Sequence, residues 1–284
     1  MLLLNYGGTK SVAPILCAAY FLGLYACEAT SKVEKRGKEA HTVDTEVTAS
    51  VQKVSHKCPS DMKHVSGLYC PQVEQRCLRW LDVNQSPSAN SGIGPMRCAE
   101  FALSKCLSKQ RKEEDVCVDE FEWPNKENEF PTLAKSWHDS KAQCESIGKR
   151  LCTAEEWTFA CEGEQMKPYP YGDGLHRDAV ACNIDQPSMD PSTPRSEWPK
   201  HNLSEPSGVR PNCVSPFGVR DMTGNVDEFV FNVGGSYTKA PFVSGLKGGY
   251  WGPVRTRCRP MTDVHGPDFS FYQIGWRCCK DVTK

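Results

Sequence analysis

The sequence lacks an excess of charge of either sign. Its 284 residues include 34 Lys and Arg against 35 Asp and Glu, a formal net charge of −1 at pH 7. Binding to nucleic acid needs a concentrated basic surface, and the chain contains no basic stripe, internal repeat or low-complexity tract. We therefore expect no nucleic-acid partner.

Several motifs of catalytic and metal sites are also missing. The chain has no Gly-x-Ser-x-Gly elbow, no His-Glu-x-x-His helix and no phosphate-binding glycine loop. Its seven histidines are scattered, and His138 and His265 are interpreted as surface residues. No Cys-x-x-Cys pair occurs, so disulfides are favoured over a structural zinc site. Hydrolase, metalloprotease and nucleotide-binding functions have no support here.

The N-terminal region is typical of an export signal. The uncharged apolar run from Val12 to Ala26 follows Lys10 and is shorter than the about 20 residues that cross a bilayer. Residues 24–27, Leu-Tyr-Ala-Cys, resemble a bacterial lipobox, which predicts a signal peptide over 1–26 and a lipid on Cys27. The alternative is an ordinary signal peptide cleaved nearby, which would release the protein.

Cysteine is abundant and its number is informative. Of 16 cysteines, Cys17 lies in the signal and Cys27 at the cleavage site, which leaves 14, enough for seven disulfides. Disulfides persist in oxidising compartments. Together with the lipobox, this number predicts an extracytoplasmic protein of the bacterial cell envelope, anchored by lipid to the outer membrane or cell surface.

The remaining chain divides into three expected segments. Residues 27–56 are polar and read as a flexible tether, 57–116 as a cysteine-rich subdomain, and 117–284 as the main domain. In the second segment, four-residue spacing of Val73, Cys77 and Leu81 predicts a short helix. A second helix is expected over 101–106, with a loop over 85–95 between the two.

Two capping boxes predict the helices of the main domain. Ser136 with Asp139 opens a helix that Gly148 ends, and Thr153 with Glu156 opens another that ends at Gly163. The first helix carries Cys144 and the second Cys161 on the face expected to be buried. Each cysteine should join its helix to a distant segment.

These helices belong to a run of ordered sequence blocks that resembles the formylglycine-generating, sulfatase-modifying factor family. The blocks are Ser136-Trp137-His138-Asp139-Ser140, Gly148 to Trp157, Tyr169-Pro170-Tyr171-Gly172, Ala181-Cys182-Asn183-Ile184, Pro216 to Glu228, Lys247 to Trp251, and Ile274-Gly275-Trp276-Arg277-Cys278. The resemblance implies an α+β fold, a loop-rich variant of the C-type lectin-like fold. It also implies disulfides between Cys144 and Cys278 and between Cys161 and Cys258.

Two further bridges are weaker expectations. Cys152 stands where many relatives have proline and Cys279 adjoins Cys278, so these two could pair. Cys182 and Cys213 flank the same long loop and are the other candidate pair.

The resemblance implies calcium as a structural cofactor. Asp221, Gly224, Val226 and Glu228 match a calcium site of the family, and carboxylates mixed with backbone carbonyls suit this hard cation. Alternatively, Asp221 and Asn225 only stabilise a turn. A second, weaker site would use Asn183 and Ile184. Asp227 departs from the family, where tryptophan is usual, and adds negative charge near the neighbouring groove.

The family's copper chemistry is not expected to carry over. Oxidising relatives have a serine directly after two glycines, followed by two cysteines five residues apart that bind copper. In this chain Tyr250 follows Gly249, and no cysteine precedes Cys258, which matches the structural disulfide position.

We therefore expect a binding or structural module rather than an oxidase. Its groove would lie around Tyr250, Trp251, Arg255 and Arg257, because aromatic faces beside guanidinium groups suit a peptide, protein or glycan ligand. The alternative is an enzyme, either a divergent oxidase that uses Cys258 or Cys279 as metal ligands or another activity on this scaffold.

Overall fold

The structure, a computed structural model, describes residues 58–82, 97–187, 190 and 192–283. The expected signal peptide (1–26), Cys27, the tether (27–56) and the loop over 85–95 lie outside the described residues. Within the described ranges, no helix has the length and apolar character needed to cross a membrane.

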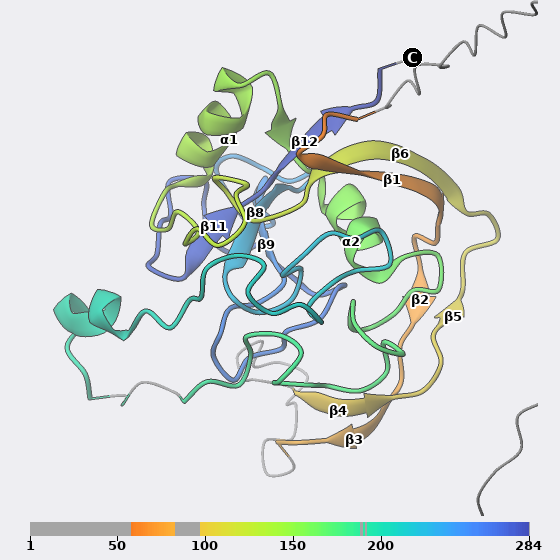
Figure 1. Ribbon diagram of the computed structural model, residues 1–284, viewed down its shortest axis with the longest axis horizontal. Helices are drawn as coiled ribbons and strands as arrows, with labels where there is room; N and C mark the ends of the chain where they lie inside the picture. The colour runs from red at the N-terminus through yellow and green to blue at the C-terminus, as the bar shows by residue number, and fades with distance from the viewer. Residues whose placement is uncertain (1–57, 83–96, 188–189, 191, 284) are drawn as a thin grey trace, which may run out of the picture. The chain divides into compact units, whose positions relative to one another are not determined.

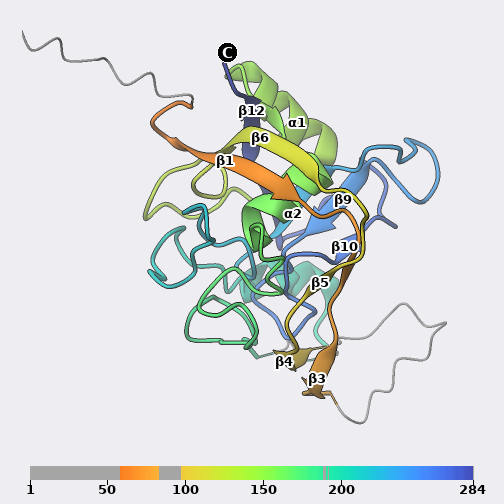
Figure 2. The ribbon, with the colours of Figure 1, turned by 90° about the vertical axis from the view of Figure 1, so that its right-hand side faces the viewer.

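Residues 58–82 and 97–119 form the two arms of one long, interrupted β-hairpin. Each strand of the first arm pairs with one of the returning arm: β1 (Met62–Tyr69) with β6 (Lys112–Asp119), β2 (Val73–Glu74) with β5 (Lys105–Cys106), and β3 (Cys77–Trp80) with β4 (Cys98–Phe101). Three nested disulfides cross-link the arms: Cys58–Cys117, Cys70–Cys106 and Cys77–Cys98. Figures 1 and 2 show the two arms side by side from β1 and β6 to β3 and β4.

The helices expected over 73–81 and 101–106 are wrong, because both segments are strands or their connections. Residues four apart lie near one face of a helix, but they also lie on one face of a strand, whose side chains alternate with a period of two. The spacing alone could not separate the two structures. Both segments are strands because they pair with the opposite arm, which the disulfides hold in place.

The hairpin shares its sheet with the C-terminal end of the chain. This sheet has the order β1-β6-β12-β7, where β7 is Arg150–Leu151 and β12 is Cys278–Asp281. The boundary expected between 57–116 and 117–284 falls inside β6, and all described residues belong to one compact unit, Lys53–Lys284. The cysteine-rich segment therefore contributes strands to the main sheet.

A second four-stranded sheet contributes residues to the wall of the candidate pocket at the Gly248-Gly249 turn. Its order is β10 (Met261–Thr262), β9 (Ser244–Lys247), β8 (Asp227–Phe231) and β11 (Ile274–Trp276), with β8 and β11 parallel. Apart from one 3₁₀ helix, η1 (Arg195–His201), the backbone between residues 163 and 226 is mostly irregular. Short strands, two α-helices and long irregular stretches give the expected α+β, C-type lectin-like fold.

Both helices of the main domain begin where the capping boxes predicted. Helix α1 (Trp137–Ser146) has Ser136 as its N-cap, and α2 (Ala154–Glu162) has Thr153. In both helices, the N-cap side chain accepts a hydrogen bond from the backbone N–H three residues later. The acidic side chain of that residue accepts from the backbone N–H of the N-cap. Beneath β1 and β6, α2 buries Trp157, Phe159 and Cys161 in the main hydrophobic core (Figure 1).

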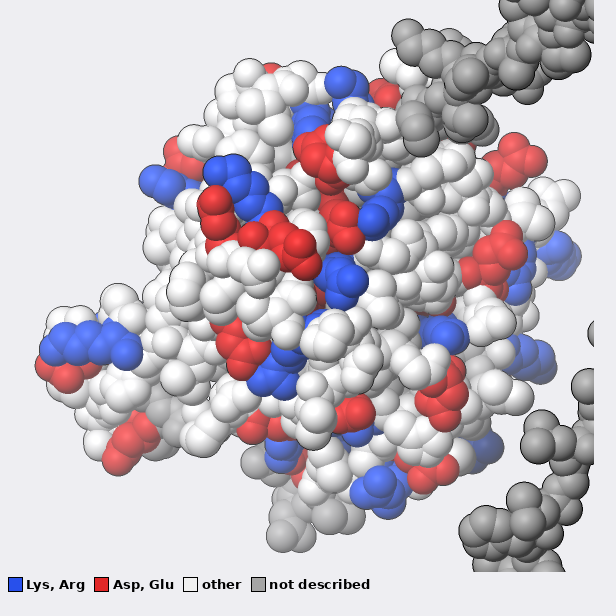
Figure 3. All heavy atoms as spheres, in the orientation of Figure 1, with Lys and Arg blue, Asp and Glu red and all other residues white. Residues whose placement is uncertain are grey.

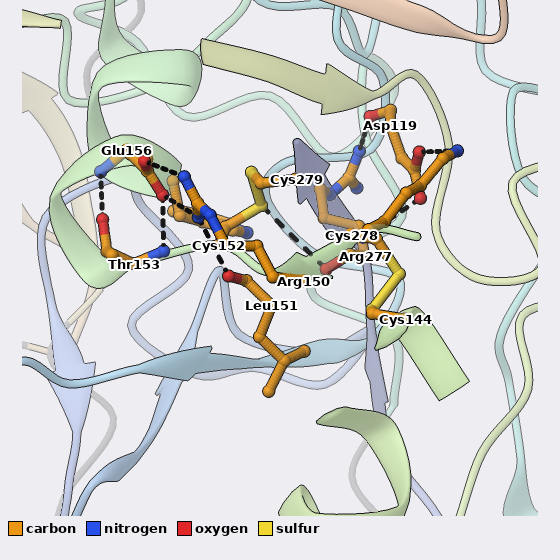
Figure 4. The surroundings of a disulfide bond; sticks show 12 residues. Asp119, Cys144, Arg150, Leu151, Cys152, Thr153, Glu156, Arg277, Cys278 and Cys279 are labelled. Atoms are coloured by element: carbon orange, nitrogen blue, oxygen red, sulfur yellow. Dashed lines mark hydrogen bonds and ion pairs between the residues drawn. A yellow bond between two sulfur atoms is a disulfide. The ribbon is translucent and has the colours of Figure 1, made fainter. Parts of the chain in front are cut away.

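Four disulfides cross-link the main domain, and two of them are formed by adjacent residues of β12. Cys278 bonds to Cys144 of α1 and Cys279 bonds to Cys152, on opposite sides of the strand (Figure 4). Cys161 bonds to Cys258 and Cys182 to Cys213. Both pairs implied by the family resemblance and both weaker candidates are formed. All fourteen cysteines from Cys58 to Cys279 are bridged.

Candidate functional site

A pocket of about 640 Å³ opens beside the Gly248-Gly249 turn. Its walls come from the end of β9 and the start of β8, from η1, and from the segment between β10 and β11. Its lining includes the charged, aromatic and imidazole side chains of Arg195, Trp198, Asp227, Tyr250, Arg255, His265, Phe269 and Phe271.

Aromatic rings form one wall of this pocket. His265 stacks on Phe269 with ring centroids 4.1 Å apart, and Phe269 stacks on Phe271 at 5.9 Å. Trp198 meets Phe271 edge to face at 5.5 Å, with Arg195 over its ring at 5.4 Å. This row of rings gives the pocket an apolar wall that a ligand stem can contact.

Charged groups of both signs face the same space. Asp227, at the start of β8, is half-buried; burial raises the pKa of its carboxyl to about 7, against the opposing effect of the Gly249 N–H. Arg255 is exposed and donates to the Met261 carbonyl at 3.2 Å and to Thr262 Oγ1 at 2.8 Å. The pocket thus combines a partly desolvated carboxylate with a guanidinium group nearer to solvent.

Two glycines set the backbone course into the pocket. Gly248 and Gly249 have φ of +88° and +73°, in the left-handed region that other residues rarely adopt. A Cβ at Gly249 would also lie 2.5 Å from Thr256 Cγ2. The turn places Tyr250 on the pocket wall, where burial raises the pKa of its hydroxyl to about 12.

The groove predicted from the sequence is present in part. Tyr250 and Arg255 line the pocket, but Trp251 is 3% exposed and packs against Tyr272 instead. Arg257 points elsewhere, with its guanidinium over the Phe101 ring at 5.3 Å. His265, expected at the surface, is half-buried in the aromatic wall. The sequence analysis missed the aromatic wall because its rings lie in loops, where hydrophobic residues follow no helical or strand periodicity.

The carboxylates predicted to bind calcium lie in a separate, buried cluster. Glu228 is 1% exposed and forms a bidentate ion pair with Arg277, at 2.7 Å to Nε and 2.6 Å to the terminal nitrogen. Trp157 Nε1 donates to the same carboxylate at 2.7 Å. Although burial opposes the charge of Arg277, Glu228 raises the pKa of this guanidinium above its usual value.

Two more carboxylates adjoin this pair. Glu122 is fully buried and accepts from Asn225 and from Ser207, while Asp221 accepts from the Gly208 N–H at 2.7 Å. Burial raises the pKa of Asp221 to about 6 and that of Glu122 well above its usual value, with Asp221 and Glu228 adding to the effect on Glu122. Glu122 escaped the sequence analysis because its partners lie 85 and 103 residues away.

The weaker calcium candidate is a hydrogen-bonding centre. The Asn183 side chain donates to the Leu203 carbonyl at 2.9 Å and to Asn225 Oδ1 at 3.1 Å, and the Asn183 backbone carbonyl accepts from the Asn225 N–H. Ile184 is buried against the cluster of Tyr169 and Tyr171. These contacts position the turn at 224–225, so a structural role accounts for Asn183.

Removing Arg277 should be far costlier than removing an exposed cation. Arg277→Met leaves Glu228 buried without its partner, which we expect to lower the free energy of unfolding by about 3 to 5 kcal/mol. Lys141→Met, which breaks only the exposed pair with Glu145 on α1, should cost about 0 to 1 kcal/mol. Equilibrium urea unfolding with disulfides intact measures both. Equal losses would contradict a dominant role for the buried pair.

Known proteins resemble this chain in sequence and in fold. The family described as "Sulfatase-modifying factor enzyme 1-like domain" matches residues 46–282. The chain is 31% identical over 164 residues to "Inactive C-alpha-formylglycine-generating enzyme 2" of Bos taurus, covering 55% of this chain and 52% of that protein. It is 29% identical over 176 residues to "Formylglycine-generating enzyme" of Mus musculus, covering 53% and 44%.

The chain therefore spans about half the length of the curated relatives it matches. Its structure is similar to the crystal structure of CarF, with a TM-score of 0.51 at 14% identity over 79% of this chain and 99% of that one, which supports the fold alone. On the sequence match over most of its length, this chain belongs to the sulfatase-modifying factor enzyme 1-like family.

Proposed function

We propose that this chain is an exported binding module of the formylglycine-generating-enzyme type, without the copper-dependent oxidation. The observation that carries the proposal is that all fourteen cysteines of the described residues are in disulfides, including Cys161 with Cys258. A thiolate must be free to bind Cu(I), and Cys258 is committed to holding α2. Cys279, the other candidate ligand, is bonded to Cys152. The divergent-oxidase alternative would require one of these bonds to be reduced.

Two further observations support a binding role. Tyr250 occupies the position after the two glycines where oxidising relatives have serine, and it lines the pocket. The bovine relative bears the name of an inactive enzyme, so loss of oxidation has a parallel in a similar sequence. The pocket that remains, with aromatic rings and charges of both signs, suits a ligand of small-molecule or side-chain size.

The disulfides support an extracytoplasmic compartment, and the lipobox-like sequence ending in Cys27 supports a lipid anchor. Seven disulfides in one chain indicate folding in an oxidising, extracytoplasmic compartment. On the face drawn in Figure 3, positive and negative side chains are interspersed, as expected of a surface that does not bind nucleic acid. We propose the bacterial cell envelope as location, with a lipid on Cys27 as the membrane partner.

Loss of Cys27 should release the protein from the membrane. In detergent phase partitioning of cells that express the full chain, we expect the native protein in the detergent phase and Cys27→Ser in the aqueous phase, because the variant has no thiol to acylate at that site. Cys17→Ser serves as the control and should behave like the native protein. A native protein found in the aqueous phase would contradict the anchor.

Calcium is proposed as a structural cofactor of the buried carboxylate cluster. Glu122, Asp221 and Glu228 lie around one fully buried cation, Arg277, with Arg220 acting on Asp221 from a half-buried position, and bound calcium would add positive charge among these carboxylates. No three Asp, Glu, His or Cys side chains converge as a metal-binding group in the described part of the chain, so backbone carbonyls must complete the shell. Gly224 and Val226, buried in the same turn, would supply them.

Calcium should stabilise the native protein and lose this effect in Asp221→Asn. At free calcium about 100 times the dissociation constant, the gain is about 2.7 kcal/mol, which raises the unfolding temperature by about 5 to 10 °C. Asp190→Asn, in an exposed turn, is the control and should keep the shift. Identical unfolding temperatures for the native protein in excess calcium and in EDTA would contradict the site.

The proposed absence of oxidation is tested with a cysteine peptide. The purified mature protein, given copper, thiol reductant and oxygen, should form no aldehyde on a peptide that "Formylglycine-generating enzyme" of Thermomonospora curvata converts in parallel. Mass spectrometry of the peptide gives the result. Aldehyde formation that Cys258→Ser abolishes would overturn the proposal and establish the oxidase alternative.

A further inference from the structure

Two opposite charges line the pocket without pairing with each other. Asp227 and Arg255 both line this pocket. The guanidinium donates to Met261 and Thr262, and the carboxylate faces the Gly249 N–H. Among the ion pairs of the described residues, Asp227 and Arg255 do not form one. The space between them is available to a ligand that carries both complementary charges.

The environment of the two groups differs in a way that orients such a ligand. Asp227 is half-buried, where an unpaired carboxylate is costly because it has lost part of its hydration. Arg255 is exposed and Arg195 adds a second exposed cation at the pocket edge. A cationic end would therefore enter the pocket, and an anionic end would stay nearer to solvent.

Aromatic rings line the same pocket as the two charges. Phe269 and Phe271 stack in one row, and Trp198 meets Phe271 and lies under Arg195. An aliphatic stem packs against the apolar surface of such a row. A purely anionic ligand would meet Asp227, and a purely cationic one would meet both arginines.

We propose that this pocket binds a small zwitterion of the ω-amino acid or lysine type. Its ammonium group pairs with Asp227, its carboxylate pairs with Arg255, and its aliphatic stem lies along Phe269 and Phe271. This assignment rests on the proposed binding function and names its ligand class. It also gives a role to Asp227, which stands where the family usually has tryptophan.

The test uses three probes of similar size on the full mature protein in detergent. 6-Aminohexanoate carries both charges, hexylamine only the cation and hexanoate only the anion, and isothermal titration calorimetry measures each affinity. We expect 6-aminohexanoate to bind most tightly, about ten- to a hundredfold more tightly than either single-charge probe, as for hydrogen bonds to charged groups. A shorter and a longer ω-amino acid then measure the charge separation.

Variants assign each end of the ligand. Asp227→Asn should weaken hexylamine and 6-aminohexanoate about tenfold or more and leave hexanoate unchanged or tighter. Arg255→Gln should weaken hexanoate and 6-aminohexanoate and spare hexylamine. Asp173→Asn, outside the pocket lining, should change none of the three affinities. Because Arg255 is exposed, its variant keeps the test available even if Asp227→Asn does not fold.

Two results would overturn the inference. Either no member of the ω-amino acid series binds more tightly than hexylamine and hexanoate, or both variants weaken all probes equally. Neither result bears on the aldehyde assay, so the module could still bind another ligand. Conversely, aldehyde formation would remove the proposed function whatever the zwitterion does.

Discussion

The buried ion pair between Glu228 and Arg277 links the two four-stranded sheets at the point where the chain passes from β11 to β12. Arg277 lies between β11 and β12 and donates to the carbonyls of Asp119, Glu120 and Arg220 as well as to Glu228 of β8. One side chain thereby joins the end of β6, the turn before β8, and β8 itself. In a domain with much irregular backbone, such a hub satisfies polar groups that helices and strands would otherwise satisfy.

The disulfides cross-link the loops around this ion pair, and they also engage the cysteines that a metal site would need. Those at Cys278 and Cys279 tie β12 to α1 and to Cys152, next to the Arg277 hub, and the pair at Cys258 ties α2 to the loop beyond the pocket. The same bonds that hold the loops leave no free thiol among the described cysteines for metal chemistry. The pocket at the Gly248-Gly249 turn, lined by the Asp227 carboxylate and the Arg255 guanidinium, is the surface that we propose to bind a ligand.

Local sequence signals predicted much of the scaffold. The capping boxes at Ser136 and Thr153 fix the starts of both helices because their hydrogen bonds span only three residues. The family resemblance supplied the fold and two disulfides. In contrast, four-residue spacing misassigned the N-terminal hairpin, whose strands depend on pairing with an arm that returns tens of residues later. Glu122 and the ring of Phe271 acquire their roles only through contacts with distant segments, which no local pattern encodes.

We propose that the cysteines of this family member serve structure rather than oxidation. A free-thiol count with disulfide mapping, by mass spectrometry of the mature protein denatured without reductant, tests this most directly. We expect no free thiol from Cys58 to Cys279, with Cys161 joined to Cys258. A free Cys258 in the native protein would contradict the proposal.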